Sequence, residues 1–209
     1  MLEDIKLYLI ADLSEKTKNT FFQRVEFYLE SGVRLFQLRA KGESEDSLRI
    51  YIERLKLLSE KYNAVFIIND YWYFVNEFEL DGVHVGREDF PVLVFKSLIA
   101  PEKIAGYTVN NEEDLAFANK IKPDYIGIGP AFFTETKSKD RLAPILGPEG
   151  VKKIVLKTFI PYYAIGGISD ENIFLLLEKG INRFAISSYL MLNPSPQKAV
   201  KLLKKYNLL

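Results

Sequence analysis

The chain has no cysteine and only one histidine, His84, among its 209 residues. The absence of cysteine excludes disulfide bonds, thiolate nucleophiles and cysteine-bound metals, and a lone histidine excludes histidine-rich metal sites. No apolar run approaches the roughly 20 residues that span a bilayer, and acidic residues stand near the N-terminus where a signal peptide would be basic. We therefore expect a cytoplasmic protein with no membrane partner.

An excess of either charge is also absent, since 28 Lys and Arg residues balance 28 Asp and Glu residues. No overall field attracts nucleic acid, so any positive patch must be local. A hydrophobic content of 48% with 27% charged residues is ordinary for a soluble protein. This length suits one sizeable core, and we expect a single domain over residues 1–209.

Short apolar segments alternate with amphipathic ones along the whole chain. The predicted strands are 7–10, 33–38, 64–68, 81–85, 103–107, 125–128, 162–165 and 183–186, and the predicted helices are 20–30, 45–62, a short one within 71–78, 90–98, 111–121, 148–156, 170–179 and 195–206. Eight such units predict an α/β fold, a single (β/α)8 TIM barrel. The alternative is a doubly wound open sheet, but the glycine-rich turn typical of that fold is missing after the first strand.

The residues that follow the predicted strands are nearly all polar or glycine. In a barrel these positions share one rim, where barrel enzymes carry their active sites. The positions are Gln37, Arg39, Lys41, Asn69, Asp70, Asp89, Thr108, Thr134, Thr136, Lys137, Gly166, Gly167 and Ser187. The opposite ends of the strands show no such convergence.

Two carboxylates and three cations stand out on this rim. Asp70 and Asp89 follow adjacent strands, and a close carboxylate pair suits Mg²⁺ that shares its coordination shell with a substrate phosphate. The alternative is that both aspartates are helix N-caps. Arg39, Lys41 and Lys137 supply the positive charge that a diphosphate requires.

A second phosphate site is predicted after the last two strands. Gly166 and Gly167 follow one strand and Ile186 and Ser187 follow the next, where barrels often bind phosphate through backbone N–H groups. Two phosphate sites on one rim indicate a reaction that joins a diphosphate ester to a phosphorylated acceptor. We expect His84, which lies between two valines, to be a packed and hydrogen-bonded residue.

Aromatic residues gather in the segment 71–74, which reads Tyr-Trp-Tyr-Phe. We interpret them as a short helix packed on the barrel, and the alternative is an aromatic wall for a ligand.

With these motifs in view, the chain resembles thiamine-phosphate synthase over nearly its whole length. The resemblance rests on QLRAK at 37–41, IND at 68–70, DGVHVGRED at 81–89, GPxFxTxTK at 129–137, AIGGI at 164–168 and AISS at 185–188. It implies that a pyrimidine diphosphate and a thiazole phosphate are joined to thiamine phosphate and pyrophosphate. It also implies a dissociative route, in which the pyrimidine cation forms as pyrophosphate leaves and the thiazole nitrogen then attacks it.

The resemblance further implies a role for each motif residue. Asp70 and Asp89 bind Mg²⁺, and Arg39, Lys41 and Lys137 are the catalytic cations. The pyrimidine diphosphate is bound by Gln37, Arg39, Lys41, Asn69, Thr108 and Lys137, and the thiazole phosphate by Thr134, Thr136, Gly167, Ile186 and Ser187, with Leu38, Ala40, Glu135 and Gly166 counted among the substrate-binding positions.

Some positions depart from the family pattern, and they bear on pyrimidine binding rather than on reaction type. Arg87 replaces the common Gln before the Glu-Asp pair, the segment 71–73 is more aromatic than usual, and Tyr107, Val109 and Asn110 differ from the usual GVSxH.

Two other functions stay open. One is a thiazole tautomerase, a related branch that lacks the IND aspartate, the Glu-Asp pair and the TxTK lysine and uses a histidine near Asn110 and Asn111. The other is a noncatalytic barrel that binds a phosphorylated metabolite. We also expect the charged loop 134–141 to close over the site. Nothing in the sequence specifies an oligomeric state.

Overall fold

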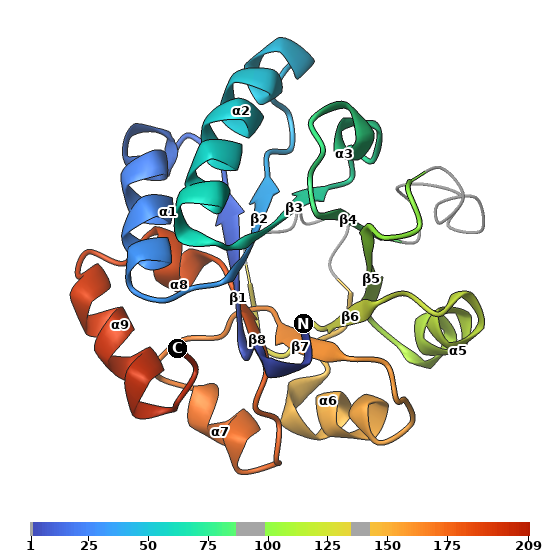
Figure 1. Ribbon diagram of the computed structural model, residues 1–209. Coiled ribbons are helices and arrows are strands. Elements are labelled where there is room, and N and C mark those ends of the chain that lie inside the picture. Colours follow the sequence, from blue (N-terminus) through green and yellow to red (C-terminus); the bar gives the residue numbers. More distant parts are fainter. Residues whose placement is uncertain (1, 87–98, 135–142) are drawn as a thin grey trace.

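The computed structural model describes residues 2–86, 99–134 and 143–209, which form a closed parallel barrel surrounded by helices (Figure 1). The strands follow chain order around the barrel, and β1 pairs with β8 to close it. The predicted (β/α)8 barrel is therefore confirmed, and the open sheet is excluded because no edge is left between the first and last strands.

The strand positions follow the apolar segments of the sequence. The strands are β1 (Leu7–Asp12), β2 (Leu35–Arg39), β3 (Val65–Asn69), β4 (Gly82–Val85), β5 (Ile104–Val109), β6 (Tyr125–Ile128), β7 (Tyr162–Ile165) and β8 (Phe184–Ile186). The helices are α1 (Phe21–Glu30), α2 (Glu45–Tyr62), α3 (Tyr73–Glu77), α5 (Glu112–Ile121), α6 (Gly147–Val155), α7 (Ile173–Leu177), α8 (Ser188–Met191) and α9 (Pro196–Lys205). Short 3₁₀ turns occupy Leu2–Asp4 and Lys18–Thr20.

Capping residues explain why both ends of helix α2 lie where the sequence predicts them. The side chain of Ser44 accepts a hydrogen bond from the Ser47 backbone N–H at 3.3 Å, and Asn63 ends α2 in the left-handed region. Helix α7 is shorter than the predicted helix 170–179. The predicted helix 90–98 lies outside the described residues.

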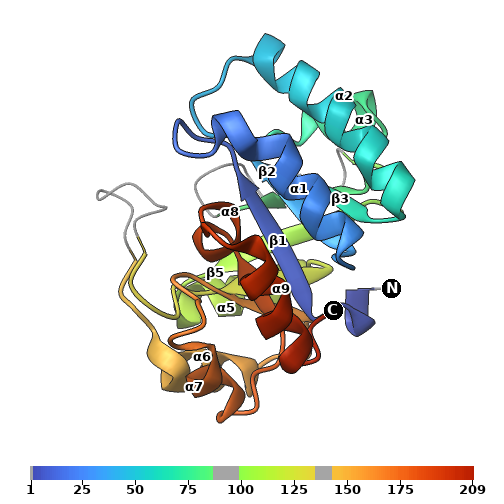
Figure 2. The ribbon, with the colours of Figure 1, turned by 90° about the vertical axis from the view of Figure 1, so that its left-hand side faces the viewer.

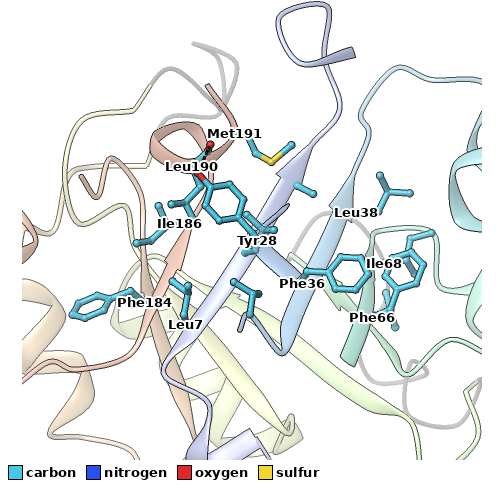
Figure 3. Close-up of a cluster of buried hydrophobic side chains, with 14 of the residues drawn as sticks. Leu7, Tyr28, Phe36, Leu38, Phe66, Ile68, Phe184, Ile186, Leu190 and Met191 are labelled. Atoms are coloured by element: carbon cyan, nitrogen blue, oxygen red, sulfur yellow. Dashed lines mark hydrogen bonds between the residues drawn. The ribbon is translucent and has the colours of Figure 1, made fainter. Parts of the chain in front are cut away.

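The alternation of each strand divides the apolar residues between two cores. Leu7, Phe36 and Phe184 belong to the outer core, between the barrel and its helices, whereas Tyr8 and Tyr163 belong to the inner one. Figure 3 shows part of the outer core, where the side chain of Tyr28 from α1 lies next to Leu190 of α8. There the Tyr28 hydroxyl donates a hydrogen bond of 2.9 Å to the Leu190 carbonyl oxygen.

The aromatic segment before α3 packs on the barrel, as predicted. Tyr71, Trp72 and Tyr73 are partly buried against the outer core, and the Tyr73 hydroxyl donates to Glu45 of α2 at 2.7 Å. Arg49 of α2 lies over the ring of Phe74. These contacts fix α3 against α2, so the predicted packing of this segment on the barrel is confirmed.

The two termini lie together at the end of the barrel where β1 begins (Figure 2). The carboxyl ends of the strands therefore open at the other end, away from both termini. Within the described ranges, no helix combines the length and the apolar character that a membrane span requires.

Candidate active site

The strand register brings the polar residues of several strands into the barrel interior. In β2, Phe36 and Leu38 lie in the outer core, so Gln37 and Arg39 face inward. The same alternation places Asn69 at the inner end of β3, where it is only 8% exposed. Because all eight strands are parallel, their carboxyl ends meet at one mouth.

Arg39 is paired with an acidic residue at the end of the neighbouring strand. Asp12 lies opposite Arg39 in the β1–β2 register, and the Arg39 guanidinium donates to its carboxylate. Both side chains are largely buried, with 16% and 18% of their surfaces exposed. Burial raises the pKa of Asp12 above its ordinary value, and the charges of Arg39 and Lys41 only partly offset that effect.

Lys41 forms the second ion pair of the mouth. Its Nζ atom lies 3.3 Å from Oδ2 of Asp70, and the two side chains are 41% and 21% exposed. Asp70 has a φ of 68°, in the left-handed region that aspartate tolerates better than most residues. Its backbone N–H donates to the His84 carbonyl oxygen at 2.9 Å, which fixes the turn after β3.

A hydrogen-bonded network crosses the barrel interior beneath these ion pairs. Gln37 Nε2 donates to the Tyr8 hydroxyl at 2.5 Å, and the Tyr8 hydroxyl lies 2.8 Å from that of Tyr125. The Tyr125 hydroxyl is 3.0 Å from Nδ1 of His84, and Nε2 of His84 is 2.9 Å from Oγ1 of Thr108. We call these five residues the tyrosine network. The prediction that His84 is packed and hydrogen-bonded is confirmed.

The segment after β7 needs glycine at two consecutive positions. Gly166 and Gly167 have φ values of 101° and 64°, and a Cβ at Gly167 would overlap the Phe133 carbonyl oxygen. Nearby, at the end of β8, the hydroxyl oxygen of Ser187 is buried and has no hydrogen-bond partner in the described part of the chain. An unsatisfied buried hydroxyl is costly unless a ligand satisfies it.

Three predicted substrate-binding residues turn their side chains away from the mouth. Leu38, Ala40 and Ile186 are each about 1–2% exposed and belong to the outer core. Any contact that they make with a substrate must therefore come from their backbone atoms.

Comparison with known proteins identifies the family. The family described as thiamine monophosphate synthase matches residues 7–190. A thiamine-phosphate synthase of Flavobacterium johnsoniae is 42% identical over 164 residues, which cover 76% of each chain. The thiamine-phosphate synthase of Synechocystis sp. is 36% identical over 95% of this chain, which spans only 56% of that protein. A thiamine phosphate pyrophosphorylase structure from Pyrococcus furiosus superposes with a TM-score of 0.85 at 32% identity. The superposition covers 98% of this chain and 96% of the Pyrococcus furiosus chain.

The chain belongs to the thiamine monophosphate synthase family. It is therefore a member of a family of transferases that act in thiamine biosynthesis. The Flavobacterium johnsoniae and Synechocystis sp. relatives are both named thiamine-phosphate synthase.

Several synthase motif residues lie outside the described residues, namely Asp89, Glu135, Thr136 and Lys137. Thr134 is the last described residue before the second of these gaps, and it is partly buried. In the ranges 2–86, 99–134 and 143–209, no three Asp, Glu or His residues gather into a metal-binding group. The described part of the motifs thus contributes one carboxylate, Asp70, to the predicted Mg²⁺ site.

Sequence reasoning missed three polar residues of this synthase barrel. Asp12 lies beyond the predicted strand 7–10, and Tyr8 and Tyr125 count there only as residues of the apolar strands 7–10 and 125–128. The signal was available in the strand pattern, because a tyrosine at an inward-facing position must find a partner for its hydroxyl. Pairing Asp12 with Arg39 required the β1–β2 register, which the sequence does not contain.

Proposed function

We propose that this chain condenses 4-amino-2-methyl-5-hydroxymethylpyrimidine diphosphate with 4-methyl-5-(2-phosphoethyl)thiazole, forming thiamine phosphate and pyrophosphate. One observation carries the proposal: Arg39, Lys41 and Asp70 gather at the same mouth as the buried hydroxyl of Ser187, which has no hydrogen-bond partner among the described residues. A cationic region and a separate phosphate region at one mouth suit two phosphorylated substrates that must meet.

The reaction requires no protein nucleophile, because the thiazole nitrogen attacks the pyrimidine carbon. The protein instead has to stabilise the negative charge that develops on the departing pyrophosphate and to align the two rings. Arg39 and Lys41 are suited to the first task, and Lys137, which completes the TxTK motif, would add a third cation. Arg39 is held in place by Asp12 before any substrate binds, which lowers the cost of reorganisation.

Mg²⁺ is the metal that we propose for this site, with Asp70 and Asp89 as its carboxylate ligands. The donor chemistry fits, since Asp70 offers hard carboxylate oxygens at the mouth and is already next to a cation, Lys41. The bound ion would neutralise part of the diphosphate charge. Lys41 would then be released from Asp70 and could contact the diphosphate directly.

The thiazole phosphate would bind on the β7–β8 side of the mouth. The glycine pair Gly166 and Gly167 presents backbone without side chains, and the buried Ser187 hydroxyl would donate to a phosphate oxygen. Thr134 and Thr136 of the TxTK motif would add two hydroxyl groups from the β6 side.

The decisive experiment measures pyrophosphate release from the purified chain with both substrates and Mg²⁺ and with each component omitted in turn. A synthase releases pyrophosphate only from the complete mixture. Binding of a substrate by calorimetry without any release would support the noncatalytic barrel. Conversion of a thiazole compound with no pyrimidine present would support the tautomerase.

A further inference from the structure

The tyrosine network links residues from five different strands, β1, β2, β4, β5 and β6, in the centre of the barrel. Tyr8, Gln37 and Tyr125 are only 2%, 3% and 1% exposed, so water does not supply their hydrogen bonds. The network ends at Gln37 on β2 and at Thr108 on β5, both of which are predicted to bind the pyrimidine substrate. Its members therefore connect two walls of one proposed subsite.

Donor and acceptor counting gives the network a direction. The Gln37 Nε2 group can only donate, so the Tyr8 oxygen accepts and the single Tyr8 proton goes to Tyr125. Tyr125 then donates its own proton to Nδ1 of His84. Nδ1 is thus an acceptor, and the ring carries its proton on Nε2, which donates to Thr108 Oγ1.

Burial supports this assignment because both phenols keep their protons. Desolvation raises the pKa of Tyr8 and that of Tyr125 well above the ordinary value for tyrosine. Two polar atoms are left at the ends, the Gln37 carbonyl oxygen Oε1 and the hydroxyl proton of Thr108. Neither has a partner within the described part of the chain.

We propose that Tyr125 is a positioning residue that holds His84 in the Nε2–H tautomer and, through Tyr8, fixes the Gln37 carboxamide. The interior then presents an acceptor on β2 and a donor on β5. A planar heterocycle that carries an amino group beside a ring nitrogen offers the complementary donor and acceptor. This last step rests on the proposed function, whereas the tautomer does not.

The backbone around Tyr125 leaves room for this contact. A Cβ at Gly106 of β5 would overlap the Tyr125 hydroxyl and lie 2.5 Å from Nδ1 of His84. Glycine at this inward-facing position is therefore required for the hydroxyl to reach the imidazole.

A third tyrosine provides a matched control. Tyr163 packs edge-to-face against both Tyr8 and Tyr125, with ring centroids 5.3 Å and 5.7 Å apart. Its hydroxyl instead donates to the Ile5 carbonyl oxygen at 3.1 Å and is not part of the network. Tyr163→Phe and Tyr125→Phe thus remove the same group from the same ring cluster, but only the second removes it from the network.

The single histidine allows a direct test. In protein labelled with ¹⁵N at histidine, the two ring nitrogens report the tautomer, and every signal belongs to His84. We expect wild type and Tyr163→Phe to show only the Nε2–H tautomer, and Tyr125→Phe to show a mixture with Nδ1–H. A wild-type Nδ1–H tautomer or a charged imidazolium at neutral pH would overturn the proposal, even if Tyr125→Phe fails to fold.

Steady-state kinetics test the consequence for binding. Tyr125→Phe should raise the KM for the pyrimidine diphosphate roughly tenfold, the effect of losing one well-oriented hydrogen bond, while the KM for the thiazole phosphate stays unchanged. Tyr163→Phe should change neither. Equal effects on both substrates would overturn the positioning role. If wild type releases no pyrophosphate, the proposed function fails, and the tautomer experiment still decides on the network.

Discussion

At the mouth of the barrel, two of the candidate cations are paired with carboxylates of different burial. Arg39 and Asp12 are mostly enclosed, whereas Lys41 is 41% exposed and pairs with Asp70 across the turn after β3. A buried pair fixes geometry, and a more exposed pair exchanges partners at lower cost. The buried Arg39 pair is therefore preformed, whereas the more exposed Lys41 would be free to leave Asp70 for a substrate if Asp70 served as a metal ligand, as proposed.

Asp70→Asn tests the metal site at the residue scale. Asparagine tolerates the same left-handed backbone, so the substitution removes charge without disturbing the turn. We expect turnover to fall about a hundredfold, because the stabilisation of the leaving pyrophosphate is lost. Calorimetry should also show weaker Mg²⁺-dependent binding of pyrophosphate.

The matched control is Asp46→Asn, which removes an exposed carboxylate from the first turn of α2. It should leave both quantities unchanged. Turnover of Asp70→Asn within a few fold of wild type at saturating Mg²⁺ would contradict the proposed ligand role.

The burial of Asp12 predicts a pH dependence of stability. Because desolvation raises its pKa in the folded protein above the ordinary value of 3.8, the folded state holds this proton more tightly than the unfolded state. The contribution of Asp12 to stability must therefore decrease as the pH rises through the window just above 3.8. Asp12→Asn removes this titration.

Denaturant unfolding of wild type and Asp12→Asn between about pH 4 and pH 7 measures the effect. The unfolding free energy of wild type, relative to that of Asp12→Asn, should decrease as the pH rises and then level off. A shift in favour of wild type would mean that the pairing with Arg39 outweighs the burial of the carboxylate.

At the scale of elements, helix α5 depends on a reciprocal pair of side-chain caps. The Asn111 side chain accepts from the Asp114 backbone N–H at 2.8 Å, and the buried Asp114 carboxylate accepts from the Asn110 N–H at 3.0 Å. Asn111→Ala should cost about 1 kcal/mol of unfolding free energy. For a chain of this size, calorimetry should show a Tm about 2–4 °C lower.

Asn119→Ala is the control for this prediction, because it makes the same change within the same helix. Asn119 is exposed and accepts a hydrogen bond from Thr158 at the surface, so Asn119→Ala should change the free energy of unfolding by less than about 0.5 kcal/mol. Similar destabilisation by both variants would show that the Asn111 cap contributes nothing specific.

Elements with their own local signals were predictable from the sequence, and those set by tertiary contacts were not. Helix α2 was predicted at Glu45 and Tyr62 from Ser44 as its cap and from its apolar face, and the structure adds that Asn63 ends it in the left-handed region. Helix α8 was missed, since its four residues, Ser188–Met191, are too few to show a helical period. The predicted helix 170–179 was too long, as α7 spans only Ile173–Leu177.

At the scale of the whole molecule, the barrel mouth was predictable because polar residues follow almost every strand. What the sequence could not provide was the pairing across strands. The links from Arg39 to Asp12 and from Tyr8 to Tyr125 depend on register and on which face of each strand points inward. The second pair is separated by 117 positions in the chain, so no local pattern could indicate it.

Closure of the barrel predicts that the chain unfolds as one cooperative unit. Strand β1 pairs with both β2 and β8, so neither half of the chain completes its sheet without the other. The single tryptophan, Trp72, lies before α3 and is partly buried against the outer core, so its fluorescence reports on the first half. Far-UV circular dichroism reports on helices in both halves.

The two signals should follow the same urea transition, with one midpoint and one slope. A reporter in the second half, Phe117→Trp in a Trp72→Phe background, should give that midpoint as well after correction for any change in stability. Phe117 is partly buried on α5 beside Tyr107, so its environment also changes on unfolding. If Trp72 responded at lower urea than the ellipticity did, the first half would unfold separately, and the prediction of one domain would be wrong.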